Sequence, residues 1–373
     1  MDRFREEEFV FLTPEKAAEF ASCEAISDDL IFTAAGTIGQ VGLIPKTSKY
    51  PKYIISNKQL RARLDVAKID PEFAYYWFAS PTRVQTIRSR NTGSTIPLIN
   101  LSVLKSLQIP VPPLNEQREI AGHLATLDNR ITLLRETNAT LEAIAQALFK
   151  SWFVDFDPVR AKMAGRAPEG MDEATAALFP DALEETELGL VPKGWQQTRV
   201  DSFIELAYGK ALKAETRRPG TVPVYGSGGI TGWHDEALVH GPSIIVGRKG
   251  TVGSLYWESR PFYPIDTVFY VKSARPLSYC YQLLKTLGLS DMNTDAAVPG
   301  LNRENAYRLL VPNPPEAVIN AFDEAARALR QMIDHYAQQS DVLAKVRDTL
   351  LPRLISGQLR LPELQDNIRR VIA

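Results

Sequence analysis

Two stretches of the sequence, residues 120–152 and 322–354, carry apolar residues at alternating spacings of four and three. A helix with this spacing presents one narrow apolar stripe, which is the pattern of a coiled coil. Asn138 and Ser340 interrupt the two stripes at equivalent positions, and a polar residue there can fix the register of a helix pair. The spacing predicts two long helices that pair antiparallel. Packing of each helix on its own domain is the alternative.

The first helix, over residues 116–153, would be roughly 57 Å long at 1.5 Å per residue. We expect Trp152 and Phe153, at its end, to face a partner protein. The positions assigned to the helix pair or to this partner surface are Leu124, Leu127, Ile131, Leu134, Asn138, Leu141, Leu148, Trp152, Phe153, Leu329, Ile333, Tyr336, Ser340, Leu343 and Leu350.

An internal repeat relates the two halves of the chain. Residues 96–100 (IPLIN) align with 298–302 (VPGLN), and residues 109–113 (IPVPP) align with 311–315 (VPNPP), at an offset of 202. Upstream, residues 36–39 (GTIG) align with 250–253 (GTVG) at an offset of 214. A repeat of this length predicts two similar domains and a pseudo-two-fold molecule.

The regions before the helices mix strand-like and helix-like segments. Residues 53–56, 243–246 and 268–271 are rich in β-branched and aromatic residues, which favours strands. Residues 74–78 and 278–284 favour matching short helices. We therefore expect an α+β fold with two mixed domains separated by the helix pair. The expected divisions are a first domain at 1–113, a helix at 114–156, a connector at 157–193, a second domain at 194–315, a second helix at 316–360 and a tail at 361–373.

The composition excludes several classes of protein. Two cysteines far apart and four histidines without ligand spacing argue against a zinc site or a disulfide framework, which fits a reducing cytoplasm. The acidic start lacks the apolar core of a signal peptide, and no apolar run reaches the roughly 20 residues of a membrane span.

Two motifs suggest chemistry but lack its essential residues. Residues 313–315 (NPP) resemble the start of a methyltransferase motif, but Glu316 replaces the required aromatic residue. The glycine-rich residues 226–232 lack the spacing of a dinucleotide loop. We also find no nucleophile elbow, zinc-protease motif or phosphate-binding loop. The sequence predicts no catalytic residue, metal or cofactor.

The charge distribution suggests nucleic-acid binding. Residues 1–30 have a balance of −6 (three Lys/Arg, nine Asp/Glu), and residues 46–105 have +8 (eleven Lys/Arg, three Asp/Glu). Solvated surface charge is the alternative, but Lys and Arg clusters with nearby hydroxyl groups suit phosphate and base contacts. The candidate DNA contacts are Lys46, Lys49, Lys52, Lys58, Arg61, Arg63, Arg88, Arg90, Thr95, Lys210, Lys213, Arg217, Arg218, Arg248, Lys249, Thr251 and Arg303.

Several long motifs resemble the specificity subunits of type I restriction-modification enzymes. Residues 112–120 (PPLNEQREI) and 147–159 (ALFKSWFVDFDPV) are similar to the central conserved region of that family. Residues 188–195 (LGLVPKGW) and 350–357 (LLPRLISG) are similar to the entry of its second target-recognition domain and to its distal helix.

This resemblance implies a non-catalytic subunit that reads a bipartite double-stranded DNA target, with half-sites about one helical turn apart. It also implies two methyltransferase subunits, which bind S-adenosylmethionine, and restriction subunits as partners. The chain departs from the family at its start, because 35 residues precede Gly36 whereas about 55 separate Gly194 from Gly250. The alternatives are a truncated or degenerate subunit that reads one half-site, a coiled-coil scaffold without a DNA role, and a stand-alone enzyme.

Overall fold

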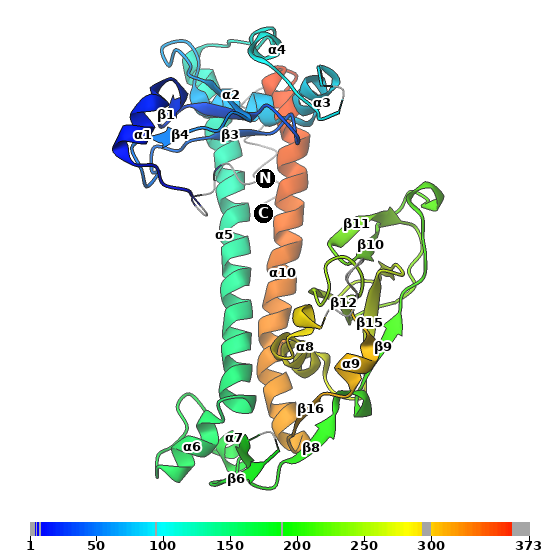
Figure 1. Cartoon of the computed structure of the whole chain (residues 1–373). Helices are drawn as coiled ribbons and strands as arrows, with labels where there is room; N and C mark the ends of the chain where they lie inside the picture. The colour runs from blue at the N-terminus through cyan, green and yellow to red at the C-terminus, as the bar shows by residue number, and fades with distance from the viewer. Residues whose placement is uncertain are drawn as a thin grey trace. The chain divides into compact units, whose positions relative to one another are not determined.

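The computed structural model describes residues 4, 6, 9–93, 95–187, 189–292 and 300–359 (Figure 1). The chain divides into two compact units. Unit 1 comprises residues 1–135 and 338–373, and unit 2 comprises residues 136–337. Each unit therefore joins one β-containing domain to parts of both long helices. The expected tail at 361–373 lies outside the described residues.

Unit 1 is built on an antiparallel sheet whose central strand, β2 (Leu30–Thr33), lies between β3 (Val41–Leu43) and β5 (Gln59–Ala62). Leu30 and Phe32 of β2 are fully buried in one core with α2 (Pro71–Ala79), while Ile31 points to the opposite face and is only partly buried. The remaining elements are α1 (Pro14–Glu19), β1 (Glu24–Ala25), β4 (Tyr53–Ile54), which pairs with β1, α3 (Pro81–Ser89) and α4 (Leu101–Lys105).

The motif at the start of the first long helix contains Gln117, whose side chain is completely buried. Its Oε1 accepts a hydrogen bond from the Asp70 N–H at 2.8 Å. Its Nε2 donates to the carbonyl oxygens of Lys68 at 3.0 Å and Pro112 at 2.8 Å. Asp70 also caps α2 by accepting from two backbone N–H groups of the first turn. One glutamine thus fixes the start of the long helix against α2.

Unit 2 contains a larger antiparallel sheet in the order β13 (Leu255–Glu258), β12 (Ser243–Gly247), β15 (Val268–Ser273), β9 (Ile204–Tyr208). All of β12 is buried, because Ile244 and Val246 face the main core of unit 2 while Ile245 joins a second cluster on the other face. A second sheet contains β11 (Gly229–His234), β10 (Val222–Gly226) and β14 (Tyr263–Pro264). The other elements are β8 (Gln196–Arg199), β16 (Leu310–Asn313), α8 (Leu277–Thr286) and α9 (Arg303–Tyr307).

The expected connector at 157–193 contains more secondary structure than its proline and glycine content suggested. It forms α6 (Asp157–Met163), α7 (Glu173–Ala177) and a hairpin of β6 (Leu183–Thr186) with β7 (Gly189–Pro192). Val159, Phe179 and Val191 of this segment are buried in the core of unit 2. Part of the segment is therefore packed against the second domain rather than being a free linker.

Backbone hydrogen bonds show the internal repeat directly. The Ile99 N–H donates to the Ala34 carbonyl at 2.8 Å, and Leu301 donates to Arg248 at the same distance. The isolated bridge between Ala35 and Leu98 likewise matches the one between Lys249 and Gly300. The offsets are those found in the sequence, 214 for the first partner and 202 for the second. The two domains therefore share one framework, although β9, β10 and β11 have no counterpart among the described strands of unit 1.

The two predicted long helices are α5 (Leu114–Phe153) and α10 (Glu316–Ile355). In unit 1, Leu124 near the start of α5 shares a core with Leu350 and Leu354 near the end of α10. In unit 2, the end of α5 shares a core with Phe322 near the start of α10. The helices therefore pair antiparallel, as predicted (Figure 1). None of the helices in the described part of the chain has the length and apolar character needed to span a membrane.

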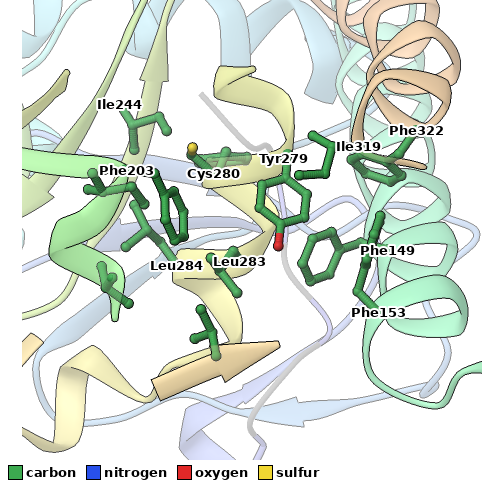
Figure 2. Packing of buried hydrophobic residues seen from close by; sticks show 14 of the residues in the cluster. Phe149, Phe153, Phe203, Ile244, Tyr279, Cys280, Leu283, Leu284, Ile319 and Phe322 are labelled. Atoms are coloured by element: carbon green, nitrogen blue, oxygen red, sulfur yellow. The ribbon is translucent and has the colours of Figure 1, made fainter. Parts of the chain in front are cut away.

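An aromatic core joins the helices of unit 2 to its β domain. Tyr279 of α8 points toward α5 and α10 in Figure 2, and its ring centre lies 5.6 Å from that of Phe149 and 5.2 Å from that of Phe153. Phe149 also contacts Phe322 of α10, with ring centres 5.5 Å apart. Three elements from distant parts of the sequence thus meet around Tyr279.

Candidate DNA interface and helix pair

Two arginines meet on one exposed tyrosine at an edge of the unit 2 sheet. The guanidinium carbon of Arg248 lies 4.9 Å from the centre of the Tyr208 ring, and that of Arg303 lies 5.0 Å from it. These are cation–π distances. The Tyr208 side chain is 47% exposed, so the ring remains open to solvent while it holds both guanidinium groups. We call Tyr208, Arg248 and Arg303 the Tyr208 cluster.

The sheet and the repeat framework bring these residues together. Tyr208 ends β9, which pairs with β15, and β15 pairs in turn with β12, directly before Arg248. Arg303 begins α9, and the hydrogen bond from Leu301 to Arg248 ties this helix to the end of β12. Side chains from three separate segments are thereby fixed at one edge by backbone bonds.

The turn after β12 is held by a serine of the glycine-rich segment. The Thr251 N–H lies 3.4 Å from the Ser227 hydroxyl, and the Ser254 hydroxyl donates to the Ser227 carbonyl at 2.6 Å. Gly250 has a φ of +83°, a conformation that glycine adopts without strain. The glycine-rich segment therefore forms the end of β10, a tight turn and the start of β11, and Ser227 in that turn supports the turn after β12.

The predicted cations of unit 2 fall into two groups. Arg218 forms ion pairs with Asp235 at 2.7 Å and Glu236 at 3.1 Å, and Arg303 forms one with the adjacent Glu304 at 3.4 Å, so both charges already have an acidic partner. The second group comprises Lys210, Lys213, Arg217, Arg248 and Lys249, and the described residues place no carboxylate within 4 Å of these cations. Arg248 instead donates to the Asp266 carbonyl at 3.1 Å, and Arg217 to the Thr231 carbonyl at 2.8 Å. The second group leaves positive charge available to an anionic ligand.

In unit 1 the acidic opening of the chain pairs with the basic stretch that follows it. Arg63 forms a bidentate interaction with the buried Asp29, at 2.8 and 2.7 Å. Glu24 forms an ion pair with Lys52 at 3.1 Å, and its carbonyl oxygen accepts a hydrogen bond from Arg61. The two charge blocks that looked separate in the sequence therefore partly neutralise each other.

The remaining candidates of unit 1 are dispersed. The Lys46 ammonium lies 3.6 Å from the Asp28 carboxylate, and that of Lys49 lies 5.4 Å from the centre of the Tyr50 ring. Arg88 donates to the Ile38 carbonyl at 3.2 Å, and Arg90 donates to the Ser106 hydroxyl. Lys58 and Thr95 are exposed. No described element brings them into one cluster with an aromatic residue as Tyr208 does in unit 2. The repeat register explains the difference, because Ala34, Ala35 and Leu101 occupy the positions of Arg248, Lys249 and Arg303.

An open cavity of about 1230 Å³ lies on the Ile31 face of the unit 1 sheet. In unit 2 the equivalent face is covered by Tyr225, Phe262 and Val268, which bury Ile245 completely. Phe11, on the chain segment before α1, borders the cavity and is 72% exposed. The two domains thus differ on the face that β10 covers in unit 2.

The helix pair contains two ion pairs at its seam. In unit 1 the Asp128 carboxylate of α5 accepts hydrogen bonds from Arg347 of α10 at 2.6 Å and from the Tyr76 hydroxyl at 2.9 Å. In unit 2 the Glu142 carboxylate of α5 accepts from Arg330 of α10 at 2.6 Å, and Lys285 and Gln282 of α8 donate to its other oxygen. Burial alone would raise the pKa of Glu142, but the bonded cations hold it below its ordinary value.

Most predicted seam positions lie between the helices or next to them. The buried positions are Leu124, Leu127, Ile131, Leu134, Leu141, Ser340 and Leu350. The partly buried positions are Leu329, Ile333, Tyr336 and Leu343. The Asn138 amide donates a hydrogen bond to the Ile333 carbonyl at 3.0 Å. Leu148 is only partly buried, because Phe149 takes the core position, where it packs against Tyr279 of α8. Trp152 and Phe153 are 7% and 6% exposed within the unit 2 core, so they do not form an open partner surface.

Sequence reasoning missed Tyr208, Phe149 and both ion pairs. Tyr208 directly precedes the Gly209-Lys210 turn, but only sheet pairing reveals its arginine neighbours. Arg347 fell on the predicted stripe, where a charge is unusual and could have prompted a search for an acidic partner on the other helix. Among the described residues, no group of three or more His, Cys, Asp or Glu side chains is arranged to hold a metal ion.

Comparisons with known proteins match this two-fold organisation. The model of the type I restriction modification DNA specificity domain matches residues 7–143 and 192–315, one copy for each repeat. The HindI specificity subunit of Haemophilus influenzae is 26% identical, with 82% of this chain and 81% of that protein covered. The MjaIX specificity subunit of Methanocaldococcus jannaschii is 25% identical, with 90% and 78% covered.

A solved structure of a type I restriction-modification S subunit from M. genitalium is also similar, at 23% identity and a TM-score of 0.48, covering 88% of this chain and 83% of that one. The family match includes more than half of the chain and follows its internal repeat. The chain therefore belongs to the family of type I restriction-modification DNA specificity subunits.

Proposed function

We propose that this chain reads a bipartite DNA target for a type I restriction-modification complex. Each repeat would contact one half of the target, and the paired helices would set the spacing between the halves. The chain would contribute recognition and positioning, while methyltransferase subunits with S-adenosylmethionine and restriction subunits supply the chemistry. The family match over both repeats supports this division of labour.

The Tyr208 cluster is the observation that carries the DNA-contact proposal. Arg248 and Lys249 have no acidic partner among the described residues, and the Tyr208 ring restricts the mobility of Arg248. A guanidinium group that is already oriented loses less conformational freedom when it binds a phosphate or a guanine edge. We therefore place the principal DNA contact of unit 2 at this edge, with Lys210 and Thr251 beside it.

A subunit that reads one half-site strongly and the other weakly is the second candidate. It is favoured by the register of the repeat, because Ala34, Ala35 and Leu101 stand where unit 2 has Arg248, Lys249 and Arg303. The ion pairs of Arg63 and Lys52 further reduce the positive charge that unit 1 offers to DNA. The two candidates differ in whether the sequence of the unit 1 half-site matters.

Salt-dependent binding of duplex DNA tests the contact surface. Each lost phosphate contact should reduce the slope of log K against log salt by about 0.9. The Arg248→Ala/Lys249→Ala variant should therefore lose about two units of slope if both cations contact phosphate. Arg199→Ala/Lys272→Ala removes two other exposed unit 2 cations, which are paired with Asp201 and Glu205, and should change little. Equal slopes for all three proteins would place the contact elsewhere.

Adenine methylation mapped across a genome tests target reading. The full chain would be expressed with its cognate methyltransferase subunit, and the modified sites would be aligned. A split motif with two defined halves supports reading by both units. A motif with one defined half supports the second candidate. A stable complex without methylation at any fixed motif would refute a reading role.

A further inference from the structure

The two seam ion pairs share one polarity. The acid lies on α5 in both, as Asp128 in unit 1 and Glu142 in unit 2. The base lies on α10 in both, as Arg347 and Arg330. All four side chains are at least three-quarters buried, with exposed fractions of 11%, 24%, 15% and 16% in the order named. At such positions the charge of the opposite side chain matters far more than at an exposed surface.

The internal repeat shows what each helix would meet if it paired with a second copy of itself. At the offset of 202, position 330 of α10 is equivalent to Asp128 of α5, and position 347 is equivalent to Ala145, which lies about one helical turn beyond Glu142. Two antiparallel α5 helices in the same register would therefore bring Glu142 of one copy against Asp128 of the other. Two α10 helices would bring Arg330 of one copy against Arg347 of the other. Because two identical antiparallel helices are related by two-fold symmetry, each of these pairings contains its like-charge contact twice.

The apolar residues of the seam do not make this distinction. Both helices carry the same heptad stripe, and both interrupt it with a small polar residue, Asn138 or Ser340. An apolar stripe alone would accept an identical helix from another chain nearly as well as its partner in the same chain. The ion pairs are the part of the seam at which the two helices carry opposite charges.

We propose that this polarity makes α5 accept α10 and reject a second copy of either helix, so that the seam closes within one chain. The occupant that fits α5 is a helix with a base at both positions, and α10 of the same chain meets that requirement. This selection acts on the assembly of the helix pair and does not depend on DNA reading. The repeat alone would allow each helix to pair with a second copy of itself, and the ion pairs favour pairing of α5 with α10 instead.

Exchanging the charges of one ion pair tests the selection against like helices while it keeps the attraction between α5 and α10. In the Asp128→Arg/Arg347→Glu variant the unit 1 pair keeps its attraction with reversed polarity, and the Glu142–Arg330 pair is untouched. Two α5 helices would now bring Arg at position 128 against Glu142, and two α10 helices would bring Glu at position 347 against Arg330. The net charge and the number of intrachain ion pairs are unchanged, but like-helix pairing becomes attractive. We expect this variant to associate at concentrations about tenfold or more below those at which the natural chain does.

The control reverses both pairs together. Asp128→Arg/Glu142→Arg/Arg330→Glu/Arg347→Glu, with Lys285→Glu to match the reversed Glu142 site, restores a uniform polarity and should return the chain to the natural behaviour. Association would be measured on the full-length chain by sedimentation over a concentration series. Co-purification of two differently tagged copies would measure exchange between chains.

The outcomes are distinct. Association of the single exchange but not of the full reversal supports the proposal. A folded single-exchange variant that remains as free of self-association as the natural chain overturns it, as does helix exchange between copies of the natural chain. If the single exchange fails to fold, Glu142→Gln/Arg330→Gln removes one charge from each like-helix clash while keeping hydrogen-bonding groups. Its self-association should then rise, and an unchanged value would overturn the proposal.

Discussion

Ile245 and Ile31 occupy equivalent places in the central strands of the two sheets, but their surroundings differ. Ile245 is fully buried in a cluster with Tyr225, Phe262 and Val268. Ile31 is partly buried and borders the cavity of about 1230 Å³. Truncation of both residues to alanine removes the same atoms, so any difference in cost reports the surroundings.

The expected magnitudes follow from burial. A fully buried isoleucine that is cut to alanine costs about 2–5 kcal/mol, because the new void adds to the lost transfer energy. We expect Ile245→Ala to cost about 3 kcal/mol. Ile31→Ala only enlarges an existing hollow, and its side chain buries less surface, so about 1 kcal/mol is expected. The difference of about 2 kcal/mol corresponds to roughly a thirtyfold change in the opening equilibrium of the affected sheet.

Amide hydrogen exchange measures the two sheets separately, which global unfolding of a chain with two units does not. Peptides from β12 and β15 should lose protection in Ile245→Ala, and peptides from β2 and β5 should lose much less in Ile31→Ala. Val246→Ala, which removes a side chain facing the other side of β12, controls for a general effect on that strand. Equal losses in the two sheets would show that the face of unit 1 is covered as tightly as that of unit 2, and would refute the reasoning.

Three further outcomes are expected. Gly250→Val places a β-branched residue at φ +83°, which should destabilise the turn by about 1–2 kcal/mol and weaken DNA binding. Thermal unfolding would measure the stability and a binding titration the affinity, and an unchanged affinity would contradict the role of the turn in DNA binding. Because the folded protein lowers the pKa of Glu142, this carboxylate stabilises the fold fully above its ordinary pKa, and the stabilisation is lost as pH falls through the lowered pKa. Glu142→Gln should therefore be less stable than the natural chain at pH 7, and its free energy of unfolding should depend less on pH in the acid range. Burial raises the pKa of Cys280 to about 11, so a thiol reagent at pH 8 should modify Cys23 alone in the native chain and both cysteines after denaturation.

The long helices and the repeat could be predicted because each depends on local spacing or on similarity between distant segments. The heptad stripe predicted the helix bounds to within two residues at the start of α5, where Pro113 ends the extended segment. The stripe did not predict the shift from Leu148 to Phe149, because that choice depends on α8 packing against the same helix. The spacing of apolar residues along one helix shows which face of the helix is packed, but it does not show that a third element such as α8 also packs against that face.

Charges were harder to interpret than apolar stripes. Sequence composition placed cations in both domains, but the local balance of +8 did not reveal that Asp29 and Glu24 would meet Arg63 and Lys52 through the fold. These acids lie more than 25 residues from their partners, so no window of the sequence contains both in an interpretable pattern. The sign of a block is therefore weaker evidence for a DNA surface than the absence of a carboxylate near each cation.

The repeat separates what the framework requires from what the surface can vary. The hydrogen bonds of Ala34 and Arg248 to the strands around them are the same, although one side chain is a methyl group and the other a guanidinium group. The same backbone hydrogen bonds form around a buried methyl group at Ala34 and a partly buried guanidinium group at Arg248. A duplicated domain can therefore keep its fold while one copy gains or loses a cationic edge. The same separation holds at the seam, where a common apolar stripe carries opposite charges on the two helices. In both places the repeat fixes the position of a side chain, and the identity of that side chain distinguishes the two halves.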